Sequence, residues 1–301
     1  MKKKILFLEL IMLIFSLTII TGNINANEMS LEIGIMPAVD SAPILLAQEK
    51  GYFAEEGLDI KVDVYTNAVN RQTALQTNKL DGAMTDLIAF VNNVNNDFPV
   101  KITTTTDGSF PILVSKDFKE KEEVKIGMME VSVTNFLAEQ FLKDKYKLNK
   151  IYIPAIPARL EMLKSGQLEM AVIPEPLAST AELQGLEKRI YKNDYDYMPE
   201  AMIFTETALS KKDKEISIFH KVYNKAVKEI NEDDQEAREV LIKSLDLPIK
   251  IKNLITMPEY HLTRIPSEDY LNKVIEWVEK TDKSQIEIDY NQVVEGKYSS
   301  Q

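Results

Sequence analysis

The chain has 301 residues, of which 45% are hydrophobic and 28% charged, a composition typical of a globular protein with about two domains. It holds no cysteine and only two histidines, which excludes disulfides, iron–sulfur clusters and cysteine zinc sites and argues against a multi-histidine metal cage. A formal net charge of −11 argues against a nucleic-acid partner.

The amino terminus has the residue pattern of an export signal. A basic start, Met1–Lys4, precedes a mostly apolar run from Ile5 to Ile20, and small and polar residues lead to Ala26. We predict a signal peptide over residues 1–26. An uncleaved membrane anchor is the alternative, although 16 residues fall short of the roughly 20 that span a bilayer. Because no cysteine is available for acylation, we expect an exported protein that is not a lipoprotein, free in the periplasm.

The rest of the chain contains an internal repeat. Leu31–Met36 and Val124–Met129 both read as short apolar strands, with an offset of 93 residues from Ile33 to Ile126. Five further residues recur at an offset of 88: Arg71, Leu75, Leu80, Asp81 and Ala83 match Arg159, Leu163, Leu168, Glu169 and Ala171. Strand–helix–strand–helix–strand written twice predicts two α/β lobes with mainly parallel sheets. Chance similarity between generic α/β patterns is the alternative.

Further elements follow the second copy of the repeat. Ala201–Thr205 reads as a strand, an apolar stripe over 216–230 predicts a long helix, and Gln235–Leu245 predicts another. Ser267 and the two acids after it start a last helix. The only tryptophan, Trp277, lies on this helix, where we expect it to pack against neighbours rather than stack on a ligand. These closing helices have no counterpart in the repeat, so we expect them to pack on the first lobe.

Three stretches of the chain carry a family resemblance. The first is APILLAQEKGYFAEEGLD at residues 42–59, the second is Leu160–Gly185, and the third runs from Met257 to Trp277 and continues at Ile288–Tyr290. Together they resemble the periplasmic solute-binding proteins of ABC importers. The branch is the one that binds nitrate, sulfonate, taurine and the pyrimidine precursor of thiamine.

The resemblance implies a two-lobed type II periplasmic-binding fold, each lobe a mainly parallel sheet flanked by helices, with two hinge crossings. By it, lobe one covers residues 30–108 plus 206–301, and lobe two covers residues 111–204. It implies a non-catalytic protein that captures a small solute between the lobes and delivers it to an ABC permease and its ATPase. We expect no cofactor and no metal.

In this fold the ligand lies where loops leave the carboxyl ends of the strands. Candidate ligand-binding residues therefore follow the predicted strands and the first crossing: Asp40, Ser41, Thr66, Asn67, Asn70, Thr85, Asp86, Asp107, Ser109, Ser132, Thr134 and Glu175. For the Ser, Thr and Asn positions, helix capping without ligand contact is the alternative. For Asp86 and Glu175 a solvated loop acid is the alternative, and Glu175 is favoured as a contact because it ends a strand between two prolines. Arg71 and Arg159 are expected to face solvent, with pairing to an anion as the alternative.

The acids among these candidates bear on the ligand. Carboxylates near one cleft would repel nitrate, sulfonate or phosphate, but they would accept hydrogen bonds from an aminopyrimidine or another amine. We therefore expect a nitrogen-containing neutral or cationic solute. A small anion such as nitrate, a sulfonate or taurine, held by helix amino termini, is the alternative.

The resemblance leaves an enzyme on the same fold, of the thiamine or menaquinone pathways, as an alternative function. A sensor domain that reports ligand occupancy to a receptor is a third hypothesis. The predicted export signal and the lack of cysteine argue against the enzymes.

Overall fold

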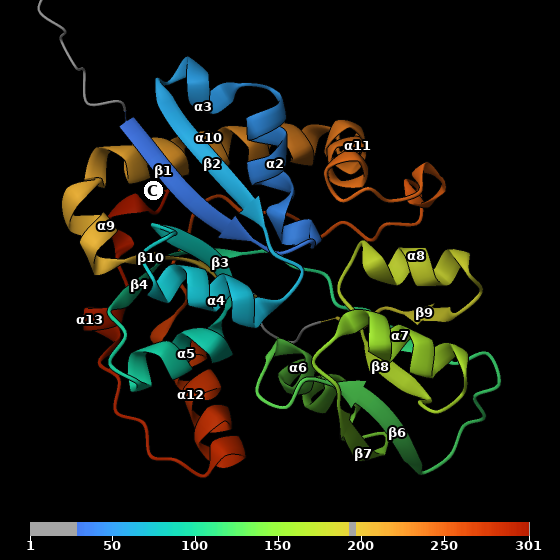
Figure 1. Cartoon of the computed structure of the whole chain (residues 1–301). Helices are drawn as coiled ribbons and strands as arrows, with labels where there is room; N and C mark the ends of the chain where they lie inside the picture. The colour runs from blue at the N-terminus through green and yellow to red at the C-terminus, as the bar shows by residue number, and fades with distance from the viewer. Residues whose placement is uncertain (1–28, 193–196, 301) are drawn as a thin grey trace, which may run out of the picture.

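The computed structural model describes residues 29–192 and 197–300, so the predicted signal peptide lies outside the described residues. Two five-stranded sheets organise the fold (Figure 1). The first has the order β2-β1-β3-β10-β4, formed by Leu58–Val64, Met29–Ile35, Gly82–Asp86, Glu200–Thr205 and Val100–Thr106. The second has the order β7-β6-β8-β5-β9, formed by Lys147–Tyr152, Glu123–Met128, Met170–Val172, Ile112–Val114 and Glu187–Arg189.

The two sheets share one strand arrangement. β1 pairs in parallel with β2 and β3, and β10 lies antiparallel between β3 and β4. In the second sheet β6 pairs in parallel with β7 and β8, and β5 lies antiparallel between β8 and β9. Only one strand in each sheet is reversed, which confirms the mainly parallel sheets expected from the repeat. Each reversed strand arrives directly from the other sheet, because the chain crosses from β4 to β5 and returns from β9 to β10.

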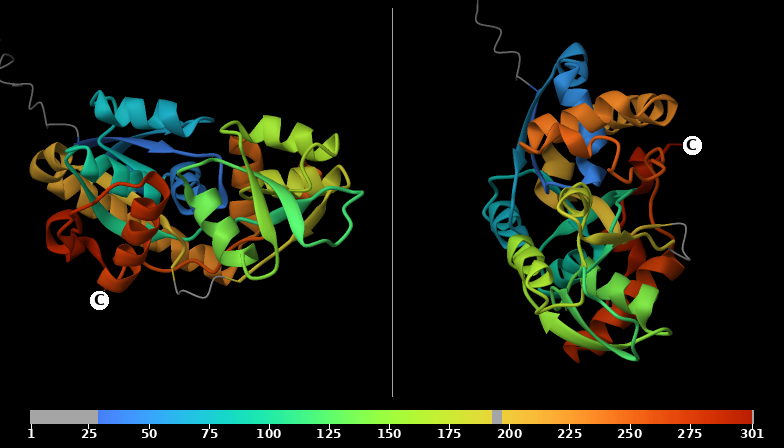
Figure 2. Two further views of the ribbon diagram at one scale, coloured as in Figure 1. Left: turned by 90° about the horizontal axis from the view of Figure 1, so that it is seen from below. Right: turned by 90° about the vertical axis from the view of Figure 1, so that its right-hand side faces the viewer.

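We call each sheet with its helices a lobe. Figure 2 shows the two lobes side by side, and this α/β two-lobed architecture confirms the predicted fold class. One predicted limit differs from the strand pairing. The range given for lobe two ends at residue 204, whereas β10 pairs with β3 and β4 of lobe one, so the second crossing ends before Glu200. The sequence shows an apolar strand there but not its partners. The other lobe limits stay predictions.

Helices cover both faces of the first sheet. One face packs against α2 (Ala42–Glu49), α3 (Tyr52–Glu55), α10 (Asp213–Glu232) and α11 (Gln235–Ser244). The other packs against α4 (Ala68–Gln76), α5 (Leu87–Asn95) and α12 (Glu268–Asp282). The short helices α9 (Glu206–Lys211) and α13 (Tyr290–Val293) and the 3-10 turns η1 (Val39–Ser41), η2 (Ile249–Ile251) and η3 (Gly296–Tyr298) complete this part of the chain. The closing helices α10, α11 and α12 thus pack on lobe one.

The second sheet has a smaller cover. α6 (Val133–Leu142) packs on one face, and α7 (Ile156–Lys164) and α8 (Leu177–Leu183) pack on the other. Among the described residues, no helix is long and apolar enough to cross a membrane.

The internal repeat of the sequence corresponds to the same side-chain packing on a strand glycine in each lobe. In each lobe a strand glycine lets a leucine and an arginine pack against the strand, because a Cβ atom at the glycine would overlap the leucine. In lobe one that Cβ would lie 2.5 Å from Leu80 Cδ1, and in lobe two 2.4 Å from Leu168 Cδ1. The two sets are Gly34, Leu80 and Arg71, and Gly127, Leu168 and Arg159. The sequence matches at offsets of 93 and 88 therefore reflect equivalent packing.

The lobes also touch away from the two crossings. Trp277 of α12 donates from Nε1 to Glu139 Oε2 of α6 at 2.8 Å, and its ring meets Phe136 of α6 edge to face, with centroids 5.6 Å apart. Trp277 is thus a packing residue, as expected, and it joins lobe one to lobe two.

We predict that Gly82→Ala destabilises the fold by about 1–3 kcal/mol, the range for overpacking a tight interior. An added Cβ would lie 2.7 Å from the backbone oxygen of Ile203 and 2.6 Å from a ring carbon of Phe204, so β10 would have to shift. Urea denaturation checks this. The exposed substitution Asp59→Asn on β2 is the control and should stay within about 0.5 kcal/mol of the wild type. An unchanged free energy of unfolding for Gly82→Ala would show that the sheet absorbs the methyl group.

Candidate functional site

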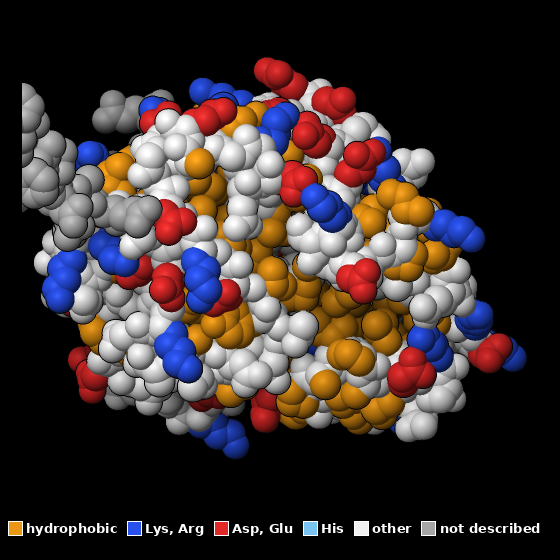
Figure 3. Space-filling model, turned by 45° about the horizontal axis from the view of Figure 1, so that its top comes forward, with side chains coloured by type: hydrophobic (Ala, Val, Ile, Leu, Met, Phe, Trp, Pro, Cys, Tyr) orange, Lys and Arg blue, Asp and Glu red, His pale blue; other side chains and the backbone are white. Residues whose placement is uncertain are grey.

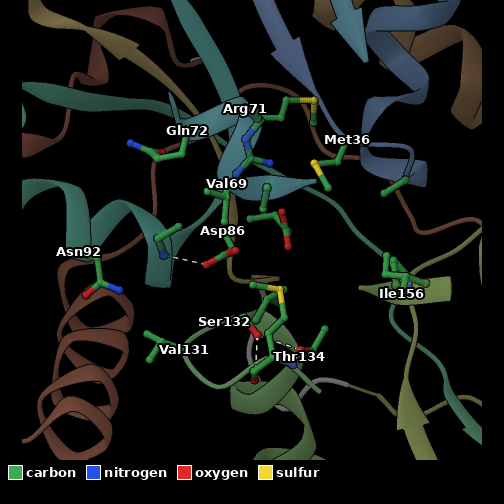
Figure 4. A pocket seen from close by; sticks show the side chains of 18 of the residues that line it. Met36, Val69, Arg71, Gln72, Asp86, Asn92, Val131, Ser132, Thr134 and Ile156 are labelled. Carbon is green, nitrogen blue, oxygen red and sulfur yellow. Dashed lines mark hydrogen bonds between the residues drawn. The ribbon is translucent and has the colours of Figure 1, made fainter. Parts of the chain in front are cut away.

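A cavity of about 350 Å³ lies between the lobes, where β1, β3 and β6 end (Figure 4). Apolar side chains from both lobes line much of it, among them Met36, Met84, Phe110, Val131 and Ile156. Figure 3 shows hydrophobic side chains gathered in a hollow on the face that it presents. The cavity therefore suits a small molecule with an apolar part.

Three acids of lobe one line this pocket, and we call Asp40, Asp86 and Glu200 the carboxyl cluster. Asp40 belongs to η1, Asp86 ends β3 and caps α5 by accepting from the Ala89 backbone N–H at 2.8 Å, and Glu200 starts β10. Glu200 pairs directly with Asp86 across the two strands. Asp40 is only 4% exposed, and its Oδ1 has no hydrogen-bond partner. The pocket thus contains a buried acceptor that an N–H or O–H donor would satisfy.

Burial raises the pKa of each acid in the carboxyl cluster. Burial raises the pKa of Asp40 to about 7, although the nearby Arg71 lowers it. Burial also raises the pKa of Asp86, and it raises the pKa of Glu200 well above its usual range, with the charges of Asp40 and Asp86 adding to the effect. The cause is the same for all three groups, because a negative charge is poorly solvated in this part of the pocket.

Two buried arginines line the pocket as well, which corrects the expectation that Arg71 and Arg159 face solvent. Arg71 is 4% exposed and donates from Nη2 to Thr85 Oγ1 at 2.7 Å. Arg159 is 1% exposed and donates from Nη1 to the Val172 carbonyl at 3.0 Å. Burial lowers the pKa of both, that of Arg159 to about 10. Their stems pack on the repeated glycines, so their equivalence in the repeat was the sequence signal that they share one role.

Lobe two contributes hydroxyl groups at the start of α6. Ser132 Oγ lies 2.8 Å from Thr134 Oγ1, which accepts from the Met129 backbone N–H at 3.1 Å. Figure 4 shows Ser132 and Thr134 on the opposite side of the pocket from Asp86 and Arg71. The acids of the pocket therefore come with Arg71 from lobe one, Ser132 and Thr134 come with Arg159 from lobe two, and both lobes supply apolar groups.

Four of the predicted site residues thus meet in one pocket: Asp40, Asp86, Ser132 and Thr134. Glu175 does not join them. Its carboxylate is fully buried and accepts from Ser179, from Lys188 Nζ at 2.8 Å and from the Thr256 backbone N–H at 3.1 Å. Lys188 Nζ also donates to the Leu254 carbonyl at 2.6 Å. The side chain turns into the contact between lobe two and the segment after η2, so Glu175 fastens the lobes together instead of lining the cavity.

Asp107 also has a structural role. It follows β4 at the first crossing, and its carboxylate accepts from the His261 backbone N–H at 2.7 Å. His261 Nδ1 lies 2.9 Å from the same carboxylate, and Arg264 Nη2 donates to it at 3.5 Å. Asp107 therefore holds the crossing against the carboxy-terminal part of lobe one and is outside the pocket lining.

The remaining predicted residues surround the pocket without lining it. Ser41 Oγ donates to the Met36 carbonyl at 2.8 Å, and Thr85 accepts from Arg71. Asn67 caps α4 by accepting from two backbone N–H groups, which favours the capping alternative there. The Ser109 carbonyl accepts from the Glu175 N–H at 2.9 Å, while Thr66 and Asn70 are exposed. Glu200 was not predicted, because its place beside Asp86 depends on strand pairing across more than 110 residues of sequence.

Comparison with known proteins decides the family. Residues 25–245 match the NMT1-like family. The chain belongs to the NMT1-like family. No curated protein matches the sequence significantly.

Solved structures of several binding proteins share the fold of this NMT1-like chain. One is a zinc-bound ligand-binding component of an ABC-type import system from Staphylococcus aureus. Its TM-score is 0.76 at 16% identity, over 90% of this chain and 97% of that one. A second is the periplasmic aliphatic sulphonate-binding protein SsuA from Escherichia coli, with a TM-score of 0.76 at 14% identity, over 91% and 93%. A third is the periplasmic nitrate-binding protein NrtA from Synechocystis, with a TM-score of 0.62 at 15% identity, over 74% and 68%. The predicted resemblance to this type of protein is confirmed.

The pocket of this NMT1-like chain offers no metal site of its own. Within residues 29–192 and 197–300, no group of three or more histidine, aspartate and glutamate side chains could hold a metal ion.

Proposed function

We propose that this protein is a non-catalytic solute-binding component of an ABC import system, which captures a small solute between its lobes and delivers it to a permease with its ATPase. The family and the fold support the binding role. The position of the pocket supports it further, since residues of both lobes line one cavity that hinge motion can close. We place the protein in the periplasm, on the basis of the export signal in its sequence.

We propose that the solute bears nitrogen and presents N–H donors, as a neutral or cationic compound. The observation that carries this proposal is Asp40 Oδ1, a buried acceptor in the pocket without a partner. A buried acceptor left unsatisfied costs about 1–3 kcal/mol, which a donor on the ligand would recover. In this assignment the ligand donates hydrogen bonds to Asp40, Asp86 and Glu200. Ser132 and Thr134 form hydrogen bonds with it from lobe two, and Arg71 donates to an acceptor on the ligand.

A second candidate ligand is a small anion. Arg71 and Arg159 both line the pocket, and two proteins with this fold are named for binding aliphatic sulphonate and nitrate. Against it stand the three carboxyls of the same pocket, whose charges exceed those of the two arginines when all are ionised and would then repel an anion.

A thermal-shift screen over pyrimidines, amino acids, polyamines, sulfonates and nitrate tests the proposal. A true solute at 100 times its dissociation constant should stabilise the protein by about 2.7 kcal/mol. Mass spectrometry should then recover the bound solute unchanged, because the proposal includes no reaction. A melting curve shifted by anions alone would overturn the ligand class, and turnover of the solute would overturn the non-catalytic role.

A further inference from the structure

When all three of its groups are ionised, the carboxyl cluster carries more negative charge than the arginines of the pocket can neutralise. Facing cross-strand residues such as Asp86 and Glu200 lie roughly 5 Å apart at Cβ, where like charges repel. Three carboxylates and two guanidinium groups give a formal charge of −1 when all are ionised. Within the described part of the chain, neither Arg71 nor Arg159 forms an ion pair with a carboxylate at 4 Å or less. The excess charge is therefore spread across the pocket and not locked into one pair.

Further titratable and charged groups face Asp40 from the elements behind it. They are Asp107 after β4, Tyr223 on α10, and Tyr260, His261 and Arg264 in the segment before α12. The negative charge of Asp107 raises the pKa of Asp40 further, but Asp107 is bonded to His261 and Arg264. Burial raises the pKa of Tyr223 and Tyr260 well above the usual range, so both stay neutral at physiological pH. None of these groups supplies a positive charge to the pocket itself.

We propose that the carboxyl cluster keeps a proton while the pocket is empty and releases it when a monocationic, N–H-donating ligand binds. The proton passes from a carboxyl oxygen to bulk water, and the positive charge of the ligand takes its place beside the carboxylate. The pocket then stays formally neutral in both states. This inference rests on the proposed function and deepens it, because it fixes the charge of the ligand and makes capture depend on pH.

The geometry and the electrostatics agree on this exchange. Asp40 Oδ1 is buried, unpartnered and in the pocket lining, so it can receive an N–H donor directly. Because the pKa of Asp40 is raised to about 7 and those of Asp86 and Glu200 are raised too, a proton competes with the cation near neutral pH. As the pH rises this competitor is lost, and affinity for the cation rises with it.

Three probes with one phenyl ring and different head groups test the inference on the protein without its predicted signal peptide. Benzamidine carries a cationic amidinium, benzamide a neutral amide, and benzenesulfonate an anion, while the ring suits the apolar lining. We expect benzamidine to bind best, with an affinity that rises by up to about tenfold per pH unit between pH 5.5 and 7.5. Calorimetry in buffers of different ionisation enthalpy should show about half a proton to one proton released per benzamidine at pH 7.

Matched variants separate the cluster from the overall charge of the protein. Asp40→Asn and Glu200→Gln should each reduce both the proton release and the pH dependence, and Asp40→Asn should weaken benzamidine binding at least about tenfold, the equivalent of one lost charge-assisted hydrogen bond. Asp59→Asn, an exposed acid on β2, removes the same charge outside the pocket and should change neither.

Each contrary outcome has its own meaning. Benzamidine binding without proton release would overturn the inference and leave the proposed function standing. Binding of benzenesulfonate alone would overturn both the inference and the proposed ligand class. Failure of all three probes would overturn the inference, whereas failure of every solute in the broader thermal-shift screen would count against the binding function itself.

Discussion

Replacing Lys188 by methionine should destabilise the protein by about 3–5 kcal/mol at pH 7, the range for removing one partner of a buried ion pair. Glu175 is fully buried and the Lys188 side chain is 5% exposed, with 2.8 Å between the charged atoms. Without Lys188 the Glu175 carboxylate would keep only hydrogen bonds from Ser179 and Thr256. Since Lys188 also donates to the Leu254 carbonyl, the variant would loosen the contact between the lobes as well. Urea denaturation measures the loss.

The double variant Lys188→Met with Glu175→Gln is the control for this prediction. It removes both charges together, so it should recover part of the loss caused by Lys188→Met alone. Because Glu175→Ala would leave the buried charge of Lys188 without this partner, we expect it to destabilise the fold. The predicted place of Glu175 in the site implied only weaker ligand binding. A free energy of unfolding for Lys188→Met within about 0.5 kcal/mol of the wild type would contradict this account of the ion pair.

Asp40→Asn should stabilise the ligand-free protein while it weakens binding. The pKa of Asp40 is raised from 3.8 to about 7 in the folded state, so this carboxyl adds stability only at low pH and loses it as the pH rises through that interval. The free-energy difference between variant and wild type should therefore be small at pH 4, grow up to pH 7 and stay constant above it, at about 2–4 kcal/mol. Denaturation series at pH 4, 5, 6, 7 and 8 measure this profile.

A second series on the exposed substitution Asp59→Asn controls for the loss of one negative charge, and its free energy of unfolding should stay within about 0.5 kcal/mol of the wild type. If Asp40→Asn is instead less stable than the wild type at pH 8, the ionised Asp40 carboxylate is stabilised by contacts that the structure does not contain. A variant that gains stability and loses affinity would show that the unpartnered carboxyl is kept for the ligand.

The sequence predicted the architecture because the recurring strand residues and the strand–helix order can each be read within one short segment of the chain. Residues such as Gly34 and Gly127 recur with their strands, and the repeated strand–helix order fixed two α/β lobes with helices packed around them. Asp40, Asp86, Ser132 and Thr134 line the pocket because they lie at or shortly after the ends of strands that point to it, and their contact with a ligand stays a prediction.

The missed and misplaced residues depend on contacts between distant segments. Glu200 reaches the pocket only because β10 returns from lobe two to pair with β3. Glu175 also follows a strand, but Lys188 and the Thr256 backbone, from other parts of the chain, capture its carboxylate. Arg71 was expected in solvent from the average behaviour of arginine, although its equivalence to Arg159 was visible in the repeat.

The position of Trp277 makes it an intrinsic fluorescence probe of the contact between the lobes. The sequence contains no second indole, and this one forms a hydrogen bond from α12 to Glu139 on α6, the helix whose first turn borders the pocket. Any separation of α12 from α6 would expose the ring to water and change its emission. Native fluorescence would therefore report the hinge motion of the proposed function, with no dye and no engineered label.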